Sequence, residues 1–283
     1  MDTRFKTFGR VLAATLGVIV LFILIIGSGN YIHSLNFFIA GKVCMLLFPV
    51  AVFYYVRWLN FSVSFLEPVT YGFSFRNLSS NLFKGFVLAT LIVAILLLSV
   101  NLFINSDFIF LPLKIDWSNS LAGLVTTLLI STIWEEFFFR GFVLTTFIYN
   151  KFGFHLSATL SSIIFALVHS LAFDVAETAW LWYLSIVILG YISALLYVLT
   201  KSIWSAAAFH FTWDFLLHLI DARKNNIGIF TIGNYGIQSE SIATVMAVIL
   251  ALAFMTILIV KHDSIKNLYP AKKLYGFPDG YSK

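Results

Sequence analysis

The sequence predicts an all-α protein, a polytopic membrane bundle of about eight transmembrane helices with a catalytic core in helices four to seven. Of the 283 residues, 60% are apolar and only 11% are charged, and the mean hydropathy is +0.93. A soluble domain carries roughly 45–50% apolar and about 25% charged residues. The apolar stretches are continuous, and a membrane leaves an open backbone without hydrogen-bond partners, so spanning helices are favoured. An ordinary soluble globule is excluded.

Each spanning helix needs about 20 residues to cross a hydrocarbon core of roughly 30 Å. Eight suitable stretches are predicted, at 11–28, 37–56, 82–104, 121–148, 156–174, 180–199, 204–220 and 242–261. The first is expected to be retained rather than cleaved as a signal peptide, because no small-residue cleavage pattern follows it.

The predicted organisation has three parts. Residues 1–120 hold the first helices, 121–220 hold the catalytic core, and 221–283 hold an outer loop, the last helix and a basic tail. The connection 57–81 is rich in aromatic residues and is predicted to lie at headgroup depth, whereas 221–241 is predicted to be an irregular loop. The single cysteine, Cys44, excludes an internal disulfide and a cysteine metal cluster.

The distribution of Lys and Arg predicts the orientation. The chain has 18 of these residues against 13 Asp and Glu, a net charge of +5. With the N-terminus inside, 13 of the 18 lie on the inner face: Arg4, Lys6, Arg10, Arg57, Arg76, Lys84, Lys151, Lys201, Lys261, Lys266, Lys272, Lys273 and Lys283. The outer face has four, which are Lys42, Lys114, Arg223 and Lys224, and Arg140 lies within a helix. The predicted location is therefore the cell membrane, with both termini in the cytoplasm, lipids as partners and no nucleic acid.

Ionisable side chains inside three of the predicted spans indicate where the site lies. Such groups are costly in a membrane and normally face the interior of a bundle. They are Glu135, Glu136 and Arg140 in the fourth span, His169 in the fifth, and His210, Asp214 and His218 in the seventh. We expect these three helices to meet around a shared polar cavity, with the other helices as scaffold.

The spacing within the helices predicts particular pairs. Glu136 and Arg140 are four residues apart, as are His210 and Asp214, so each pair can meet on one helix face. Glu135 lies about 100° around the helix from Glu136 and can point into the cavity. The predicted catalytic residues are Glu135, Glu136, Arg140, His169, His210 and Asp214, with Phe165, one turn before His169, as a wall of the cavity and His218 as a structural residue. Most of these groups also have a structural interpretation: Glu136 with Arg140 as a simple ion pair, His169 as a hydrogen-bonded interior histidine, and His210 with Asp214 as a polar clamp between helices.

Three motifs occur in order on these helices. Residues 135–140 read E-E-F-F-F-R, 165–169 read F-A-L-V-H, and 210–214 read H-F-T-W-D. They resemble the three signatures of the CPBP intramembrane proteases, the family of the Rce1-type CAAX prenyl endopeptidases and the bacteriocin-processing Abi proteins. The resemblance covers roughly 121–220, about a third of the chain.

The resemblance implies hydrolysis of a peptide bond in a membrane-associated peptide or protein. It assigns activation of a water to Glu135 and His169, and stabilisation of the oxyanion to His210 and Asp214. A carboxylate in an apolar cavity is a better general base than one in water, and a neutral histidine can donate to an oxyanion. Asp214 departs from the Asn of the prenyl-processing branch. An ionised Asp would repel an oxyanion, so it must carry a proton or act by orienting His210.

Two questions stay open at this level. Glu135, His169 and His210 also form a possible zinc set, so the cofactor is either none or one zinc ion, and the metal-free mechanism is favoured. A non-catalytic membrane scaffold or immunity protein of the same fold, or a proton-coupled transporter, are the alternative functions. Counting residues along each span further predicts a cavity open to the cytoplasm, near Lys151 and Lys201.

Overall fold

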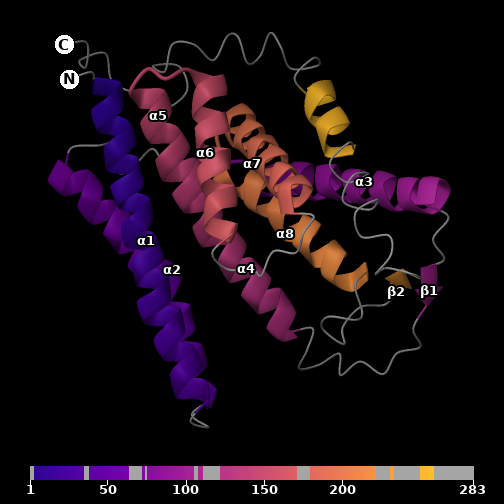
Figure 1. Ribbon diagram of the computed structural model, residues 1–283, viewed down its shortest axis with the longest axis horizontal. Coiled ribbons are helices and arrows are strands. Elements are labelled where there is room, and N and C mark those ends of the chain that lie inside the picture. Colours follow the sequence, from indigo (N-terminus) through magenta and orange to yellow (C-terminus); the bar gives the residue numbers. More distant parts are fainter. Residues whose placement is uncertain are drawn as a thin grey trace.

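The computed structural model describes residues 3–34, 38–63, 72–73, 75–104, 108–110, 122–170, 179–220, 230–232 and 249–257. The elements are α1 (Thr3–Ser34), α2 (Phe38–Val63), α3 (Leu78–Ile104), β1 (Phe108–Phe110), α4 (Ala122–Glu136), the π-helix η3 (Phe137–Leu144), α5 (Thr145–Tyr149), α6 (Phe154–Ser170), α7 (Ala179–Thr200), α8 (Ile203–Ile220) and β2 (Phe230–Ile232). A further helix covers 249–257. In Figure 1, α1 and α2 pack side by side along one flank of the remaining helices.

The all-α fold class is confirmed. Outside the short antiparallel ladder of β1 and β2, every described element is helical. Three helical stretches of the described residues are long and apolar enough to cross a membrane: Arg4–Ser28, Leu78–Leu102 and Trp180–Thr200. The protein is therefore a helical membrane bundle, and its predicted number of eight crossings stays a prediction. Two predicted spans are described only in part, those at 156–174 and 242–261. The tail lies outside the described residues.

The predicted fourth span is not one regular α-helix. Its middle, η3, is a π-helix in which the backbone bonds reach five residues back instead of four. Two hydroxyls bond carbonyls of this segment: Thr145 Oγ1 donates to Arg140 O at 3.0 Å, and Ser161 Oγ of α6 donates to Phe139 O at 2.8 Å. Such segments are frequent at functional sites. Here it directly follows the two glutamates.

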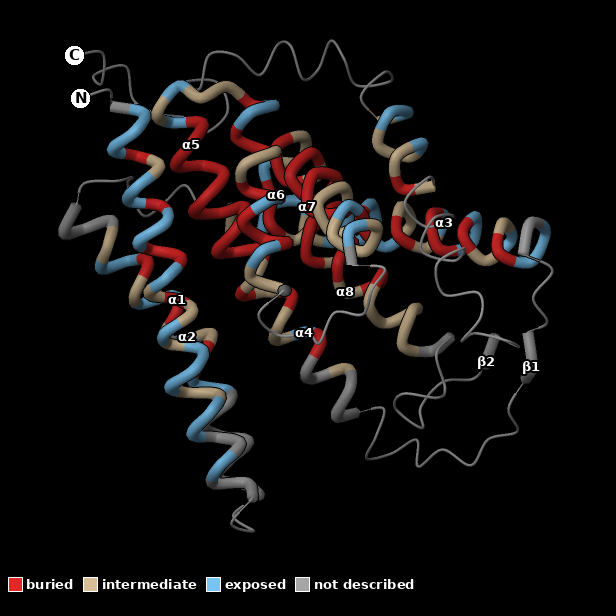
Figure 2. The backbone as a smooth tube through the Cα atoms, in the orientation of Figure 1, coloured by how far each residue is buried: buried red, intermediate tan, exposed pale blue. Residues whose placement is uncertain are grey.

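The core lies around η3, all of whose residues are buried. Its phenylalanines pack on one another and on α6, with Phe138 and Phe139 in edge contact and Phe139 against Phe165 at 5.0 Å. In Figure 2 the buried residues concentrate where α5, α6 and α7 meet, while the lower part of α1 and α2 is largely exposed. The apolar faces of α1 and α2 are thus available to lipid.

The two ends of the bundle differ. One end, which we call the basic end, joins the start of α1 to the turn before α6, since Arg4 Nη2 donates to Lys151 O at 3.1 Å. The same end holds the turn between α7 and α8, because Tyr197 and Thr145 share a hydrogen bond, and the segment before α3, because Ile203 N donates to Gly72 O at 3.0 Å. At the opposite end, β1 follows α3 and pairs with β2, which follows α8.

The aromatic connection 57–81 is described only in part. Phe73 packs between Phe137, at a ring distance of 5.3 Å, and Trp204, at 6.0 Å. Phe75 and Trp58 are exposed, and the headgroup depth of this connection stays a prediction. Residues 64–71 lie outside the described part of the chain.

Candidate active site

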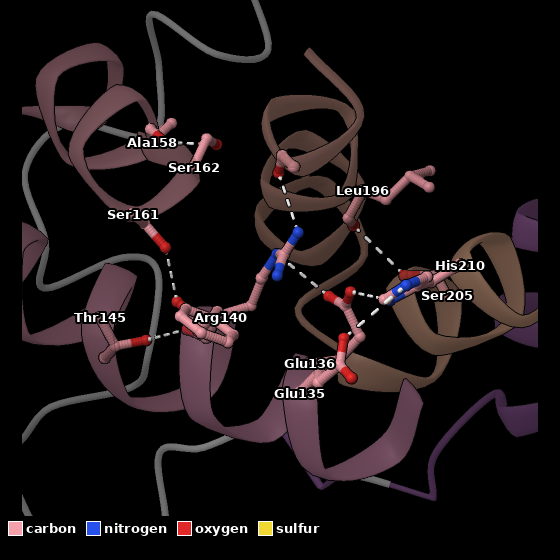
Figure 3. A network of polar contacts seen from close by, with 12 residues as sticks. Glu135, Glu136, Arg140, Thr145, Ala158, Ser161, Ser162, Leu196, Ser205 and His210 are labelled. Atoms are coloured by element: carbon pink, nitrogen blue, oxygen red, sulfur yellow. Dashed lines mark hydrogen bonds and ion pairs between the residues drawn. The ribbon is translucent and has the colours of Figure 1, made fainter. Parts of the chain in front are cut away.

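Glu136 and Arg140 form a buried ion pair beside the start of η3. The Nε atom of Arg140 lies 3.1 Å from Glu136 Oε2, and the side chains are 1% and 0% exposed. The N–H of Nε is not aligned for a hydrogen bond, so the contact is electrostatic. Figure 3 shows the guanidinium reaching past Glu136 to α7, where its Nη2 donates to Gly190 O at 3.3 Å. The pair predicted from spacing is therefore present and fixed to a second helix.

The second oxygen of Glu136 holds His210 of α8. Its Oε1 lies 2.9 Å from His210 Nδ1. A carboxylate that pairs with Arg140 only accepts hydrogen bonds, so Nδ1 is the donor in this contact. His210 Nε2 then carries a proton only when the ring is an imidazolium. A donor role for Nε2 therefore requires the imidazolium form, while the donor role of His210 itself stays a prediction.

His210 Nε2 faces the other two carboxylates of the site. It lies 3.3 Å from Asp214 Oδ2 and 3.8 Å from Glu135 Oε2. The Asp214 contact is the predicted pair one turn along α8. Because an imidazolium Nε2 donates and a carboxylate accepts, Asp214 is placed to orient the ring of His210.

His169 also bonds through Nδ1, but its partner is a backbone carbonyl instead of a carboxylate. Its Nδ1 lies 2.9 Å from the carbonyl oxygen of Phe165, which can only accept, so Nδ1 is the protonated nitrogen. In the neutral ring the lone pair of Nε2 is then directed into the site, where Glu135 Oε2 lies 3.7 Å away. The distances of 3.7 and 3.8 Å between Glu135 Oε2 and the two Nε2 atoms exceed that of a direct hydrogen bond.

Phe165 forms the apolar wall of the site, as predicted. Its ring centroid lies 4.2 Å from that of His169 and 5.7 Å from that of His210. The guanidinium of Arg140 stands 4.5 Å from the same centroid, within the range of a cation–π contact. One aromatic ring therefore contacts groups from all three motifs.

The side chains of the site become more exposed in one direction. The exposed fraction is 0% for Glu136, 1% for Arg140, 5% for His210, 12% for Glu135, 20% for His169 and 29% for Asp214. The more exposed groups lie toward the C-terminal ends of α6 and α8, which is the end opposite the basic end. Residues 136–148, which lead to the basic end, are buried throughout, and this packing argues against the predicted opening near Lys151 and Lys201. Depth counted along straight helices takes no account of side-chain packing.

The structure brings the six predicted site residues together from α4, η3, α6 and α8. The expected meeting of three helices is confirmed, with α4 and η3 forming one of them. His218, predicted to be structural, points back to its own helix, its Nδ1 donating to Asp214 O at 2.7 Å. Gly190 was not predicted, and neither was the contact between Glu136 and His210. Both connect residues 50 or more positions apart, and nothing in local spacing signals them.

The described residues contain no group of three or more His, Cys, Asp and Glu side chains arranged to hold a metal ion. The alternative zinc set consists of Glu135, His169 and His210. Both histidines approach one oxygen of Glu135, but the three side chains are not arranged to hold a metal ion. We therefore derive no step through a metal, and metal dependence stays a prediction.

Comparison with known proteins agrees with the motifs. Residues 117–216 match the family model described as Rce1-like, Type II CAAX prenyl endopeptidase Rce1-like. The match contains all six site residues, and it confirms the resemblance to the CPBP proteases. About a third of the chain, within a helical membrane bundle, is thus similar to the Rce1-like endopeptidase family. No curated protein and no solved structure matched the chain significantly.

Proposed function

We propose that this protein is an intramembrane endopeptidase that hydrolyses a peptide bond of a membrane-associated peptide or protein. The observation that carries the proposal is the position of Glu135 Oε2, 3.7 and 3.8 Å from the Nε2 atoms of His169 and His210. A carboxylate that lies between the Nε2 atoms of two histidines can act as a base toward one of them, and an imidazolium at His210 would supply a cationic donor beside it.

In the proposed reaction, Glu135 is the general base. A water held between Glu135 and His169 loses a proton to the carboxylate and attacks the carbonyl carbon of the scissile bond. His169 Nε2 accepts a hydrogen bond from the same water and orients it, because its tautomer is fixed by Phe165 O. Attack converts the carbonyl oxygen into an oxyanion.

His210 is the proposed oxyanion donor. Its Nε2–H turns to the developing negative charge while Nδ1–H stays bound to Glu136, so the cation is positioned before the reaction begins. Collapse of the intermediate breaks the C–N bond, and the proton taken up by Glu135 passes to the leaving amine. A carboxylic acid and an amine are released, and Glu135 returns to its starting form.

The family match supports this reaction class, since the matched family is described as an endopeptidase family. The apolar surroundings support a substrate that enters the membrane or lies at its surface. Protein and lipid partners of this kind, and the cell membrane as location, are part of the proposal. We expect no nucleic-acid partner.

The proposal is tested with purified protein and quenched fluorogenic peptides, or with membrane peptides that accumulate in a deletion strain. Glu135→Gln and His169→Ala are each expected to abolish cleavage, while the protein remains folded and inserted. The matched control is His155→Ala, which removes a histidine from the same helix as His169 but far from the site, where it bonds Tyr191. His155→Ala should cleave normally.

The same variants separate the alternative functions. A transporter would show altered flux in Glu135→Gln, and a scaffold would keep its interactions. Full cleavage by either Glu135→Gln or His169→Ala contradicts the proposed mechanism.

A further inference from the structure

We infer that the active site receives its substrate from the non-cytoplasmic side of the membrane, so that the substrate is a translocated peptide segment rather than a cytoplasmic tail. This inference rests on the proposed function and adds the class of substrate. It follows from which end of the bundle the site opens at and from which end carries the positive charge.

The first step is the direction of the opening. Exposure rises from Glu136 at 0% to Asp214 at 29%. α6 and α8 both start at the basic end, and His169 and Asp214 lie in their C-terminal halves. α4 starts at the opposite end, so along this helix Glu135 lies closer to that end than Arg140 does. Three helices therefore place the entrance at the end opposite Lys151 and Lys201.

The second step closes the other route. Between Glu136 and the turn at the basic end, every residue of η3 is buried, and so are residues 145–148 of α5. Phe147 packs against Phe8 and Phe152, which seals the bundle beside the start of α1. Close packing along this helical run therefore offers no exposed route from the basic end to Glu135 among these residues.

The third step orients the bundle. Eight exposed Lys and Arg side chains lie toward the basic end, in the first turns of α1 and α3, the last turns of α2 and the two interhelical turns: Arg4, Lys6, Arg10, Arg57, Arg76, Lys84, Lys151 and Lys201. Among the described residues, Lys42 at the start of α2 belongs to the opposite end. Segments rich in Lys and Arg remain in the cytoplasm. The basic end is thus the cytoplasmic end.

Together these steps assign the kind of substrate. A cytoplasmic lipidated tail would meet the packed basic end, whereas a peptide segment on the other side of the membrane meets Asp214 and His169 directly. The peptide must also extend into the membrane by the depth of the site, which favours a segment that is extended and partly apolar. A precursor that is exported before it is cut fits this requirement.

The opening is tested by cysteine labelling in sealed vesicles of known orientation. In a Cys44→Ser background, Lys151→Cys and Lys201→Cys probe the basic end, and His218→Cys probes the entrance one turn beyond Asp214. A charged, membrane-impermeant maleimide should label the first two only from the cytoplasmic side and the third only from the other side. Labelling of His218→Cys from the cytoplasmic side, or from neither side, overturns the inference, as does reversed labelling of both lysine positions.

The direction of cleavage is tested with an equimolar mixture of charged, quenched fluorogenic decapeptides. Cleavage of one sample of the mixture is first measured with the protein in detergent, where both faces are accessible. Fresh, uncleaved mixture is then supplied to one side of sealed vesicles. We expect cleavage only from the non-cytoplasmic side, with a loss of at least tenfold from the cytoplasmic side. Cleavage in detergent but only from the cytoplasmic side overturns the inference and leaves the proposed function intact. Absence of cleavage in detergent counts against the proposed function, while the labelling still decides the opening.

Discussion

Glu136 binds His210 and Arg140 with different oxygens of one carboxylate, Oε1 at 2.9 Å from His210 Nδ1 and Oε2 at 3.1 Å from Arg140 Nε. The second glutamate of the first motif therefore positions the histidine of the third. Glu136 and Arg140 are 0% and 1% exposed, so each depends on protein groups rather than on bulk water for its partners. The buried pair of Glu136 and Arg140 therefore holds the ring of His210 in place.

Removing one member of this pair should lower both stability and activity. Glu136→Ala leaves Arg140 buried without its counter-ion, and Arg140→Ala leaves Glu136 with His210 as its remaining partner. A buried charge without its partner costs about 3–5 kcal/mol of the free energy of unfolding. Thermal unfolding in detergent measures the first effect, and peptide cleavage measures the second.

The double variant Glu136→Gln with Arg140→Met removes both charges and keeps a side-chain oxygen for His210. It should recover part of the stability lost in the single variants, because no unpaired charge remains. If its destabilisation equals the sum of those of Glu136→Gln and Arg140→Met, the two side chains are not coupled.

Gly190 is a second predicted point of sensitivity. A Cβ at this position would lie 3.1 Å from both Cβ and Oγ of Ser162 and 3.4 Å from Arg140 Nη2, so α7 would have to move or the guanidinium would shift. Because the shift passes through Arg140 to Glu136 and His210, Gly190→Ala should lower kcat about 10- to 100-fold with little change in KM. Steady-state kinetics on a cleaved peptide measure this.

Two further variants show whether the effect passes through this contact. Gly27→Ala adds the same methyl group to a helical glycine with open space around it, and should leave kcat unchanged. Ser162→Gly removes both close atoms of α6 and should restore part of the kcat of Gly190→Ala. Unchanged kcat in Gly190→Ala would remove Gly190 from the positioning of the site.

Much of the site could be predicted because its residues lie at helical spacing. Glu136 with Arg140 and His210 with Asp214 are one turn apart, so the sequence alone indicates that each pair meets. An intramembrane charge also has few stable positions except a shared interior, which brings the three helices together. Helical spacing and the placement of charges in apolar spans can both be seen in a single sequence, so these parts of the site are predictable.

The remaining features depend on packing between distant segments. The π-helix is stabilised by Ser161 Oγ from α6 as well as by Thr145 Oγ1, and no local pattern signals that α6 will supply this donor. The inferred opening of the site rests on which side chains are buried, whereas depth counted along the chain points to the other end. Side chain burial is set by the whole bundle.

Asp214 stands where the prenyl-processing branch has Asn. The contact between Asp214 and His210 predicts how the replacement of Asp214 by Asn should affect activity. If Asp214 acts by accepting a hydrogen bond from His210 Nε2, then the amide oxygen of Asn can replace it. Asp214→Asn should retain activity within about tenfold, whereas Asp214→Leu, similar in size but without an acceptor, should lose about 100-fold or more. An Asn variant as impaired as the Leu variant would show that the charge or proton of Asp214 is required.

The last prediction concerns metal. A histidine ligates a metal through an unprotonated nitrogen, and binding must displace any proton there. His210 donates from Nδ1 to Glu136, and its Nε2 faces Asp214 at 3.3 Å, so ligation would require loss of the cation that the proposed mechanism uses. Cleavage by purified protein should therefore persist after extended treatment with a strong zinc chelator, and metal analysis should find well under one zinc per chain. Adding zinc to Glu135→Gln should restore nothing, since the missing group is the base. Stoichiometric zinc, together with activity that is lost on chelation and regained on zinc addition, would instead establish Glu135, His169 and His210 as ligands and replace the metal-free mechanism.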